Sequence, residues 1–411
     1  MNTFFVSVER LSDPTLIEKP VVVGAPPKSR GVVAAASYEA RRFGIHSAMP
    51  MAQAVRRYPE LVIVPPHFKS YQRHHEQIKA IMQDFSPIVE MTSIDEGYID
   101  LGGTEGLWGP PLEAGRRIRR RIQEETRLPA SVGIASNMLV SKVASDLAKP
   151  AGNPRLGSSA APGGLNKQRI SSEHWPEELR AEGVLLVPPG EEAAFLAPLP
   201  ASYLPGCGQV TLPKLQALGI HTIGELAARS EKELEGLFGE LGRMLRRRAN
   251  GKGAQSLGSG HQRKSISKET TFARDVSDSA RLEAVLHRLT EEMATTLRQR
   301  GEVARTITMK LRTGGFETHT AAKTLAAPTD QTQPLFNEAA ALLRTHASSD
   351  QPLRLIGVGV SNLMKGWSQE DLFARGERAR DHRRTAAVDA IRQRFGKDSL
   401  LTGESVNLIR D

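Results

Sequence analysis

The sequence predicts an α+β protein built from several domains. Its 411 residues exceed what one ordinary domain holds, so two to four domains are expected. Short strand-like runs alternate with helical patterns along most of the chain. A Gly/Ser-rich stretch, 251–262, separates a last segment in which strand, helix, two strands, helix and strand follow one another. We therefore expect a separate βαββαβ domain at 263–365.

The charge of the chain favours a polyanionic partner. Lys and Arg number 55 against 46 Asp and Glu, which gives a formal net charge of +9. A membrane is the weaker choice, because no run approaches the roughly 20 apolar residues of a spanning helix. The first residues lack a signal-peptide pattern, so a cytoplasmic protein is expected. The single cysteine, Cys207, excludes an internal disulfide, and His74 and His75 are predicted to lie on a solvated helix face.

Two adjacent acids, Asp95 and Glu96, are the best candidates for catalysis. The runs IVEMTS before them and GYIDL after them predict the two arms of a hairpin, which places both acids at its bend. In a regular strand neighbouring side chains point to opposite faces, so both acids reach one metal site only where the strand begins or turns. A solvated turn is the plain alternative. The apolar flanks favour a site for Mg²⁺, which takes a few carboxylates and completes its shell with water and phosphates.

The segments before the acidic pair predict strands, helices and one phosphate-binding turn. FFVSV at 4–8 predicts a short strand, or a strand end, that leads into a helix. Tyr38 and Arg41 lie three residues apart and would share one helical face, where a hydroxyl and a guanidinium can hold the same phosphate. An exposed turn is the alternative. Residues 68–85 predict an amphipathic helix that leads to the hairpin.

After the acidic pair, a basic helix at 113–127 and the strand SVGIA precede a helix that carries Lys142 and Lys149. Lys149, near the end of this helix, either caps the helix dipole or reaches a triphosphate. Residues 153–183 lack periodicity and predict an inserted loop.

Two later segments carry candidate DNA contacts. Short helices are predicted about a PGCG turn that contains Gly206 and Gly208, with Gly219 in a second turn. Such a helix–hairpin–helix presents backbone amides to a phosphate without reading the base sequence. In the βαββαβ segment, Thr, Lys and Arg alternate along the strands, so one face would be buried and the other cationic. Lys310 and Arg312 are the predicted contacts there.

Seven stretches in order resemble the Y-family translesion DNA polymerases of the bacterial DNA polymerase IV type, over nearly the whole chain. They are FFVSVE, ASYEARRFGIHSAMPM, SIDEGYID, SVGIASNMLVSKVASDLAKPAG, LPGCG, SKETTF and AIRQRFG. The resemblance implies a right-hand polymerase with a palm, fingers and a helix–hairpin–helix thumb, plus a βαββαβ little-finger domain. The implied domains are palm 1–10 and 68–187 with the unusual inserted loop 153–183, fingers 11–67, thumb 188–250, linker 251–262, little finger 263–365 and tail 366–411.

The resemblance also implies the reaction and the role of each residue. The reaction is error-prone transfer of nucleotides from dNTPs to a primer 3′-hydroxyl, by two Mg²⁺ ions and without proofreading. Primer–template DNA, dNTPs and the replication sliding clamp would be the partners of a monomeric protein. Asp95 and Glu96 would hold the metals, Phe5 would be the steric gate against a 2′-hydroxyl, and the nucleotide would be bound by Thr3, Phe4, Tyr38, Arg41 and Lys149.

Two departures from the family pattern bear on activity and partners. The family's first strand carries a metal-binding Asp directly before the Met-Asx pair, which here is Met1-Asn2, so we expect native residues upstream that end in Asp. If they are absent, the palm sheet would expose two strand edges, and the alternative is a catalytically silent, polymerase-like DNA-binding accessory protein. QEDLF lies inside the tail, where Gln369, Leu372 and Phe373 would bind the sliding clamp.

Overall fold

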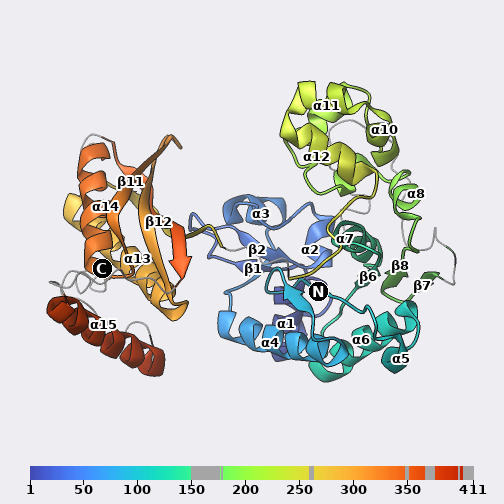
Figure 1. The fold of residues 1–411 in the computed structure, drawn as a ribbon, viewed down its shortest axis with the longest axis horizontal. Helices are drawn as coiled ribbons and strands as arrows, with labels where there is room; N and C mark the ends of the chain where they lie inside the picture. Colours follow the sequence, from blue (N-terminus) through green and yellow to red (C-terminus); the bar gives the residue numbers. More distant parts are fainter. Residues whose placement is uncertain are drawn as a thin grey trace. The chain divides into compact units, whose positions relative to one another are not determined.

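The structure is a computed structural model, and it describes residues 1–149, 176, 179–258, 263–347, 351–365, 375–396 and 399–400 (Figure 1). The chain divides into two compact units, Met1–Gly260 and His261–Asp411. None of the helices in the described part has the length and apolar character to span a bilayer.

The first unit begins with a helix. α1 spans Phe4–Ser12, so the predicted strand at 4–8 is wrong. Phe4, Val6 and Val8 are buried in the core of this unit, and the helix packs against α4 (Phe68–Phe85). The strand preference of Phe and Val is overridden here by burial against a neighbouring helix.

A small sheet follows α1 and the 3-10 helix Pro14–Leu16. Strand β1 (Val21–Gly24) is fully buried and lies between antiparallel β2 (Val33–Ala36) and parallel β3 (Val62–Val64). Two short helices, α2 (Tyr38–Arg42) and α3 (Met51–Arg57), connect β2 to β3. The hydroxyl of Ser37 caps α2 by accepting from the Ala40 N–H, which fixes where Tyr38 and Arg41 begin their turn.

Two further sheets lie above the packed pair α4 and α6 (Pro111–Thr126). Strands β4 (Val89–Met91) and β5 (Gly97–Ile99) form an antiparallel hairpin, and α5 (Glu105–Trp108) follows it. β6 (Val132–Ile134) pairs in parallel with β8 (Val184–Leu186), and α7 (Met138–Leu147) follows β6.

The predicted loop 153–183 is wrong at its last residues. Arg180–Ala181 form strand β7, which pairs antiparallel with β8 to give the order β6-β8-β7. Gly183 has φ +68°, a conformation that glycine adopts readily, and it forms the tight turn between β7 and β8.

A helical segment closes the first unit, with helices α8 (Glu192–Leu196), α9 (Thr211–Ala217), α10 (Ile223–Ala228), α11 (Glu231–Phe238) and α12 (Glu240–Ala249). The PGCG turn lies between two short helices as predicted, the 3-10 helix Ala201–Tyr203 and α9. α9 and α10 flank the second turn at Gly219, and a capping box of Thr222 and Glu225 starts α10.

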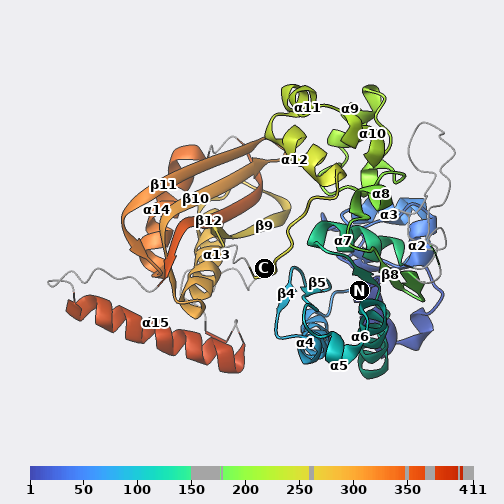
Figure 2. The ribbon, with the colours of Figure 1, turned by 45° about the vertical axis from the view of Figure 1, so that its right-hand side comes forward.

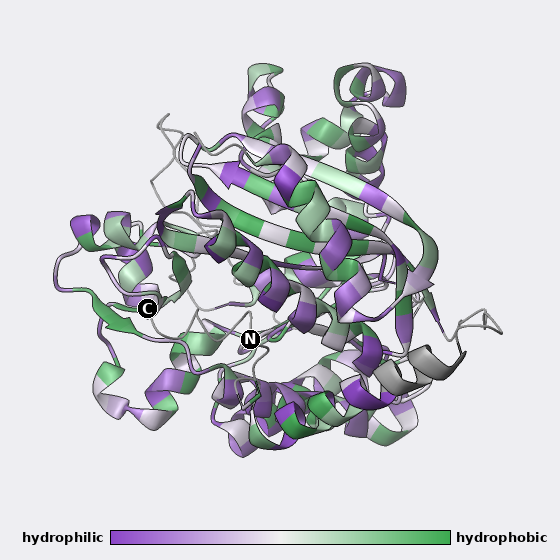
Figure 3. Cartoon of the chain, turned by 90° about the vertical axis from the view of Figure 1, so that its left-hand side faces the viewer, coloured by the Kyte–Doolittle hydropathy of each residue, from purple (hydrophilic) through white to green (hydrophobic). Residues whose placement is uncertain are grey.

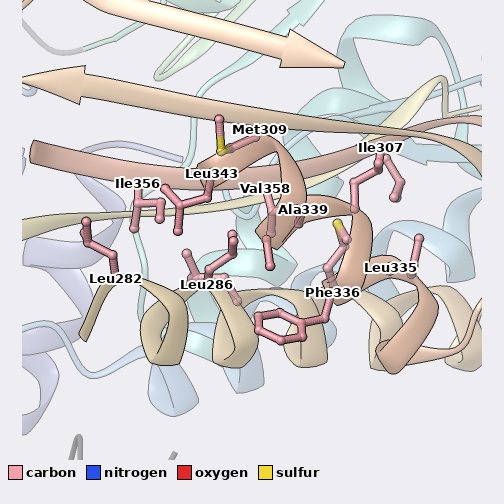
Figure 4. Close-up of a cluster of buried hydrophobic side chains, with 14 of the residues drawn as sticks. Leu282, Leu286, Ile307, Met309, Leu335, Phe336, Ala339, Leu343, Ile356 and Val358 are labelled. Carbon is pink, nitrogen blue, oxygen red and sulfur yellow. The ribbon is translucent and has the colours of Figure 1, made fainter. Parts of the chain in front are cut away.

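The second unit has the predicted βαββαβ order. Four antiparallel strands lie in the order β11-β10-β12-β9, and α13 and α14 pack on one face of the sheet (Figures 1 and 2). Apolar side chains from both helices and from β10 and β12 fill the space between them (Figure 4). The elements are β9 (Ser265–Val276), α13 (Ser279–Gln299), β10 (Glu302–Thr313), β11 (Thr318–Thr329), α14 (Thr332–His346) and β12 (Leu353–Lys365).

Strand β10 shows why this sheet has one apolar face. Ile307, Met309 and Leu311 are buried and alternate with partly exposed residues, among them Lys310. The same alternation appears as bands of polar and apolar colour along the strands in Figure 3.

The last helix, α15 (Arg375–Phe395), attaches to the second unit through polar groups. The guanidinium of Arg298 on α13 lies 2.6 Å from the Asp389 carboxylate, and Arg392 lies 3.0 Å from Glu291. All four side chains are at most 18% exposed. In one pair the arginine is on α13 and the acid on α15, and in the other pair the arginine is on α15 and the acid on α13.

Candidate active site

The two acids lie at the bend of the β4–β5 hairpin, as predicted. Met91 pairs with Gly97, and the N–H groups of Thr92 and Ser93 both donate to the Glu96 carbonyl, at 3.0 and 3.1 Å. The Ser93 hydroxyl donates to Asp95 at 2.8 Å. These bonds fix the backbone that carries both carboxylates.

Histidines predicted to face solvent support this bend. Nδ1 of His75 lies 2.9 Å from the Ile94 carbonyl, directly before Asp95. His74 is 9% exposed and bonds to the Ser70 carbonyl at 2.8 Å. The predicted solvated face is therefore wrong, because α4 packs against the hairpin on this side.

Helix α7 brings two lysines to the acids. Nζ of Lys142 lies 2.5 Å from Glu96, and Nζ of Lys149 lies 2.5 Å from Asp146, a buried acid that is also 3.6 Å from Lys142. Burial alone would raise the pKa of Glu96. The hydrogen bond and charge of Lys142 outweigh it, with a contribution from Lys149, so the pKa of Glu96 lies below its ordinary value and the carboxylate is ionised.

A cavity of about 420 Å³ lies beside these charges. It is lined by both acids and both lysines, and by residues from α1, β2 and α2. Seven of the predicted site residues therefore share one cavity: Thr3, Phe4, Phe5, Arg41, Asp95, Glu96 and Lys149. Carboxylates and cations that line one cavity suit a ligand that carries both a metal ion and a polyphosphate.

Tyr38 lies next to this cavity through Arg41. The Arg41 guanidinium is 5.4 Å from the centre of the Tyr38 ring, so the predicted shared face of the helical turn is present. Burial raises the pKa of the Tyr38 hydroxyl, which therefore keeps its proton and can donate a hydrogen bond.

A second cavity, of about 430 Å³, lies between β5 and β6. Ile78 and Met82 of α4 and Ile118 and Ile122 of α6 line its apolar part. Asp95, Glu96, Lys142 and Lys149 line both cavities. β5 and β6 belong to separate sheets, and within the described residues each pairs with only one other strand.

Comparison with known proteins shows which family this arrangement belongs to. Residues 1–146 match the impB/mucB/samB family, and residues 263–372 match the C-terminal domain of that family. These two matches cover more than half of the chain. The chain belongs to this family of Y-family DNA polymerases.

Curated members of the family align over almost the full chain. DNA polymerase IV of Dehalococcoides mccartyi (strain CBDB1) is 37% identical, over 99% of this chain and 96% of its own. DNA polymerase IV of Halorhodospira halophila is 36% identical over 91% and 96%, and DNA polymerase IV 1 of Bacillus subtilis is 33% identical over 99% and 92%.

Solved structures show the same fold. The Y-family DNA polymerase chimera Dbh-Dpo4(243-245)-Dbh superposes with a TM-score of 0.71, at 23% identity, over 89% of this chain and 98% of that chain. DinB from Sulfolobus solfataricus gives a TM-score of 0.56 with the same identity and coverage. The predicted multidomain α+β class is confirmed by these likenesses.

The predicted DNA-binding and clamp-binding residues do not line either cavity in the described part of the chain. Gly206, at φ +102°, lies in the PGCG turn. On the exposed side of β10, Lys310 bonds to Glu269 at 2.8 Å and Arg312 bonds to Thr318 at 2.8 Å. Gly208 lies in the same PGCG turn. The predicted clamp-binding residues Gln369, Leu372 and Phe373 lie outside the described residues.

The site also contains one residue that the sequence predictions passed over, Asp146. It lies four residues after Lys142 and three before Lys149, at and just beyond the end of α7. That spacing is the signal that identifies Asp146, whose carboxylate holds both lysines in place.

Proposed function

We propose that this chain is an error-prone translesion DNA polymerase that acts in the cytoplasm and transfers nucleotides from dNTPs to the 3′-hydroxyl of a primer on template DNA. The observation that carries the proposal is the 420 Å³ cavity, which combines Asp95 and Glu96 with Arg41 and Lys149. A catalytically silent DNA-binding protein has no need of this combination. The curated relatives are named DNA polymerase IV, which also favours the enzyme.

Asp95 and Glu96 fit Mg²⁺ because both are hard oxygen donors on a rigid bend. When bound, two Mg²⁺ ions would increase the nucleophilicity of the primer hydroxyl and neutralise charge on the phosphates. Within the described residues, no three His, Cys, Asp or Glu side chains converge on one point. Two carboxylates from one bend therefore leave a two-metal site short of protein ligands.

Cations of the cavity would bind the triphosphate. Arg41 and Lys149 would neutralise its charge, and the Tyr38 hydroxyl and the backbone N–H groups of Thr3 and Phe4 would donate hydrogen bonds to it. Lys142, now paired with Glu96, adds a further positive charge beside the acids. We propose a palm, fingers, thumb and little finger with the boundaries that the family resemblance implies.

Primer extension tests the metal site. Three versions of the protein are compared. The first is the chain as given, and the second carries, before Met1, a short extended segment whose last residue is Asp. A third ends in Asn as a matched control. We expect the Asp version to extend primers with Mg²⁺, and expect Asp95→Asn and Glu96→Gln to abolish this activity. Equal rates in all three versions would show that two carboxylates suffice, and no extension by any version would favour the silent DNA-binding protein.

Phe5 is proposed as the steric gate, because its ring lines the cavity and a ribose 2′-hydroxyl is excluded by volume alone. We expect Phe5→Ala to admit ribonucleotides, which is measured as the ratio of ribo- to deoxynucleotide incorporation. An unchanged ratio would mean that Phe5 is only a packing residue.

We propose that QEDLF binds the sliding clamp, with Leu372 and Phe373 in an apolar pocket and Gln369 fixing the register by hydrogen bonds. Replacing both Leu372 and Phe373 with Ala should abolish clamp binding and leave extension of short primers intact. Clamp binding that survives this double change would refute the site.

A further inference from the structure

The ring of Phe5 lies on a second aromatic ring that reaches it from another helix. Phe5 and Tyr71 are stacked with centroids 4.2 Å apart and an interplanar angle of 15°. Phe68 stands edge-on to both rings, at 6.1 Å from Phe5 and 5.8 Å from Tyr71. Tyr71 is fully buried, whereas Phe5 lines the 420 Å³ cavity, called the nucleotide cavity from here on. The position of Tyr71 therefore sets how far the Phe5 ring reaches into that cavity.

A buried carboxylate holds the far end of Tyr71. The Tyr71 hydroxyl donates a hydrogen bond to Glu9, whose side chain is only 7% exposed. Nδ1 of His67 lies 2.9 Å from the other carboxylate oxygen. Phe5 and Glu9 are four residues apart on α1, and His67 and Tyr71 are four apart at the start of α4. Each helix therefore presents an i, i+4 pair to the other.

This network is a costly way to hold two helices together. Burying a carboxylate is strongly unfavourable unless it is fully partnered, and an apolar pair in its place carries no such cost. What the carboxylate adds is direction, because a hydrogen bond to the phenol oxygen fixes the ring along its long axis. Burial and the bond to Glu9 raise the pKa of the Tyr71 hydroxyl, so it remains a donor.

We propose that Glu9 is a positioning residue for sugar discrimination, acting through the Tyr71 hydroxyl on the ring of Phe5. The inference rests on the proposed role of Phe5 as the steric gate. His67 is the second partner that makes the buried carboxylate tolerable.

The test compares Tyr71→Phe with a matched control. Tyr71→Phe keeps the stacked ring and removes only the bond to Glu9. Tyr58→Phe removes the same kind of bond elsewhere, because Tyr58 donates to Glu60 at 3.2 Å and stacks on Phe43 at 4.2 Å, with no part of this pair in the nucleotide cavity. The readout is the ratio of Kd values for ribo- and deoxynucleoside triphosphates. It is measured on the protein bound to template and a dideoxy-terminated primer with Mg²⁺, so it needs no turnover.

We expect Tyr71→Phe to move this ratio toward ribonucleotides about fivefold to tenfold, the range of one ordinary hydrogen bond. Tyr58→Phe should leave the ratio unchanged. Glu9→Gln keeps an acceptor of the same shape and should give a smaller shift, and combining it with Tyr71→Phe should add nothing.

Two results would overturn the inference, and Phe5→Ala separates them. If Phe5→Ala shifts the ratio while Tyr71→Phe changes only the melting temperature, the network is purely structural. If Phe5→Ala leaves the ratio unchanged as well, the steric-gate role fails and the positioning role fails with it.

Discussion

Gly133 lets α7 lie directly on β6, and replacing it should disturb the lysines of the site. A Cβ added at Gly133 would lie 2.0 Å from the Ser141 carbonyl oxygen and 2.3 Å from the Ser145 nitrogen, both on the backbone of α7. Real Cβ atoms stay at least 3.0 Å from such atoms, so Gly133→Ala must push α7 away by about 1 Å. Lys142 and Lys149 move with this helix.

Two quantities follow from that displacement. Overpacking of this size costs about 1–3 kcal/mol of stability, and a misplacement of about 1 Å in a site costs roughly 100-fold in rate. We therefore expect Gly133→Ala to lower the melting temperature by several degrees and to lower kcat/KM for single-nucleotide addition by about 100-fold. The assay is thermal unfolding together with primer extension, in whichever N-terminal version is active.

A glycine in a helix with open space around it provides the control. A Cβ added at Gly236 on α11 would meet no atom within 4 Å, so Gly236→Ala should leave the rate unchanged and stabilise the helix by about 0.5–1 kcal/mol. A Gly133→Ala protein with the parent rate and melting temperature would refute the close packing of α7 on β6.

Three other outcomes are expected. Lys149→Ala should weaken dNTP binding about tenfold or more by removing a charge-assisted contact; unlike Phe5→Ala it should leave the ribo/deoxy ratio unchanged, and a changed ratio would argue against a phosphate contact. DNA affinity should fall by orders of magnitude between roughly 50 and 200 mM salt, equally on two unrelated duplexes, and a flat response would contradict phosphate binding. Burial raises the pKa of Cys207 to about 11, so at pH 8 iodoacetamide should label the unfolded chain and not the native one; rapid native labelling would show that the PGCG turn opens.

The sequence predicted the elements that are bounded by prolines or flanked by strand-favouring residues. The helix at 68–85 has the predicted bounds, because Pro65-Pro66 precede it and Ser86-Pro87 stop it. The hairpin bend at Asp95 and Glu96 followed from strand-favouring residues on both sides. The βαββαβ order followed from alternation along the strands and from a long helical pattern at 279–300, which the structure has as α13 (Ser279–Gln299).

Features that depend on distant contacts were not predictable in this way. FFVSV has strand-favouring residues but forms a helix, because burial against α4 decides its conformation. His75 bonds to Ile94, 19 residues away, and Lys142 bonds to Glu96, 46 residues away. No periodicity in the sequence indicates such pairs. The network of Glu9, His67 and Tyr71 is hidden for the same reason, although each i, i+4 spacing is visible.

The attachment of α15 gives the second unit two levels of stability. Within the described residues, no side chain of α15 belongs to the buried apolar cluster between the sheet and helices α13 and α14. Its anchors are the ion pairs of Asp389 and Arg392, so opening of this helix exposes little apolar surface. Amide hydrogens of α15 should therefore exchange with solvent long before those of β10 and β12. Added salt should hasten this exchange only slightly, because ion pairs as buried as these are screened much less than exposed ones.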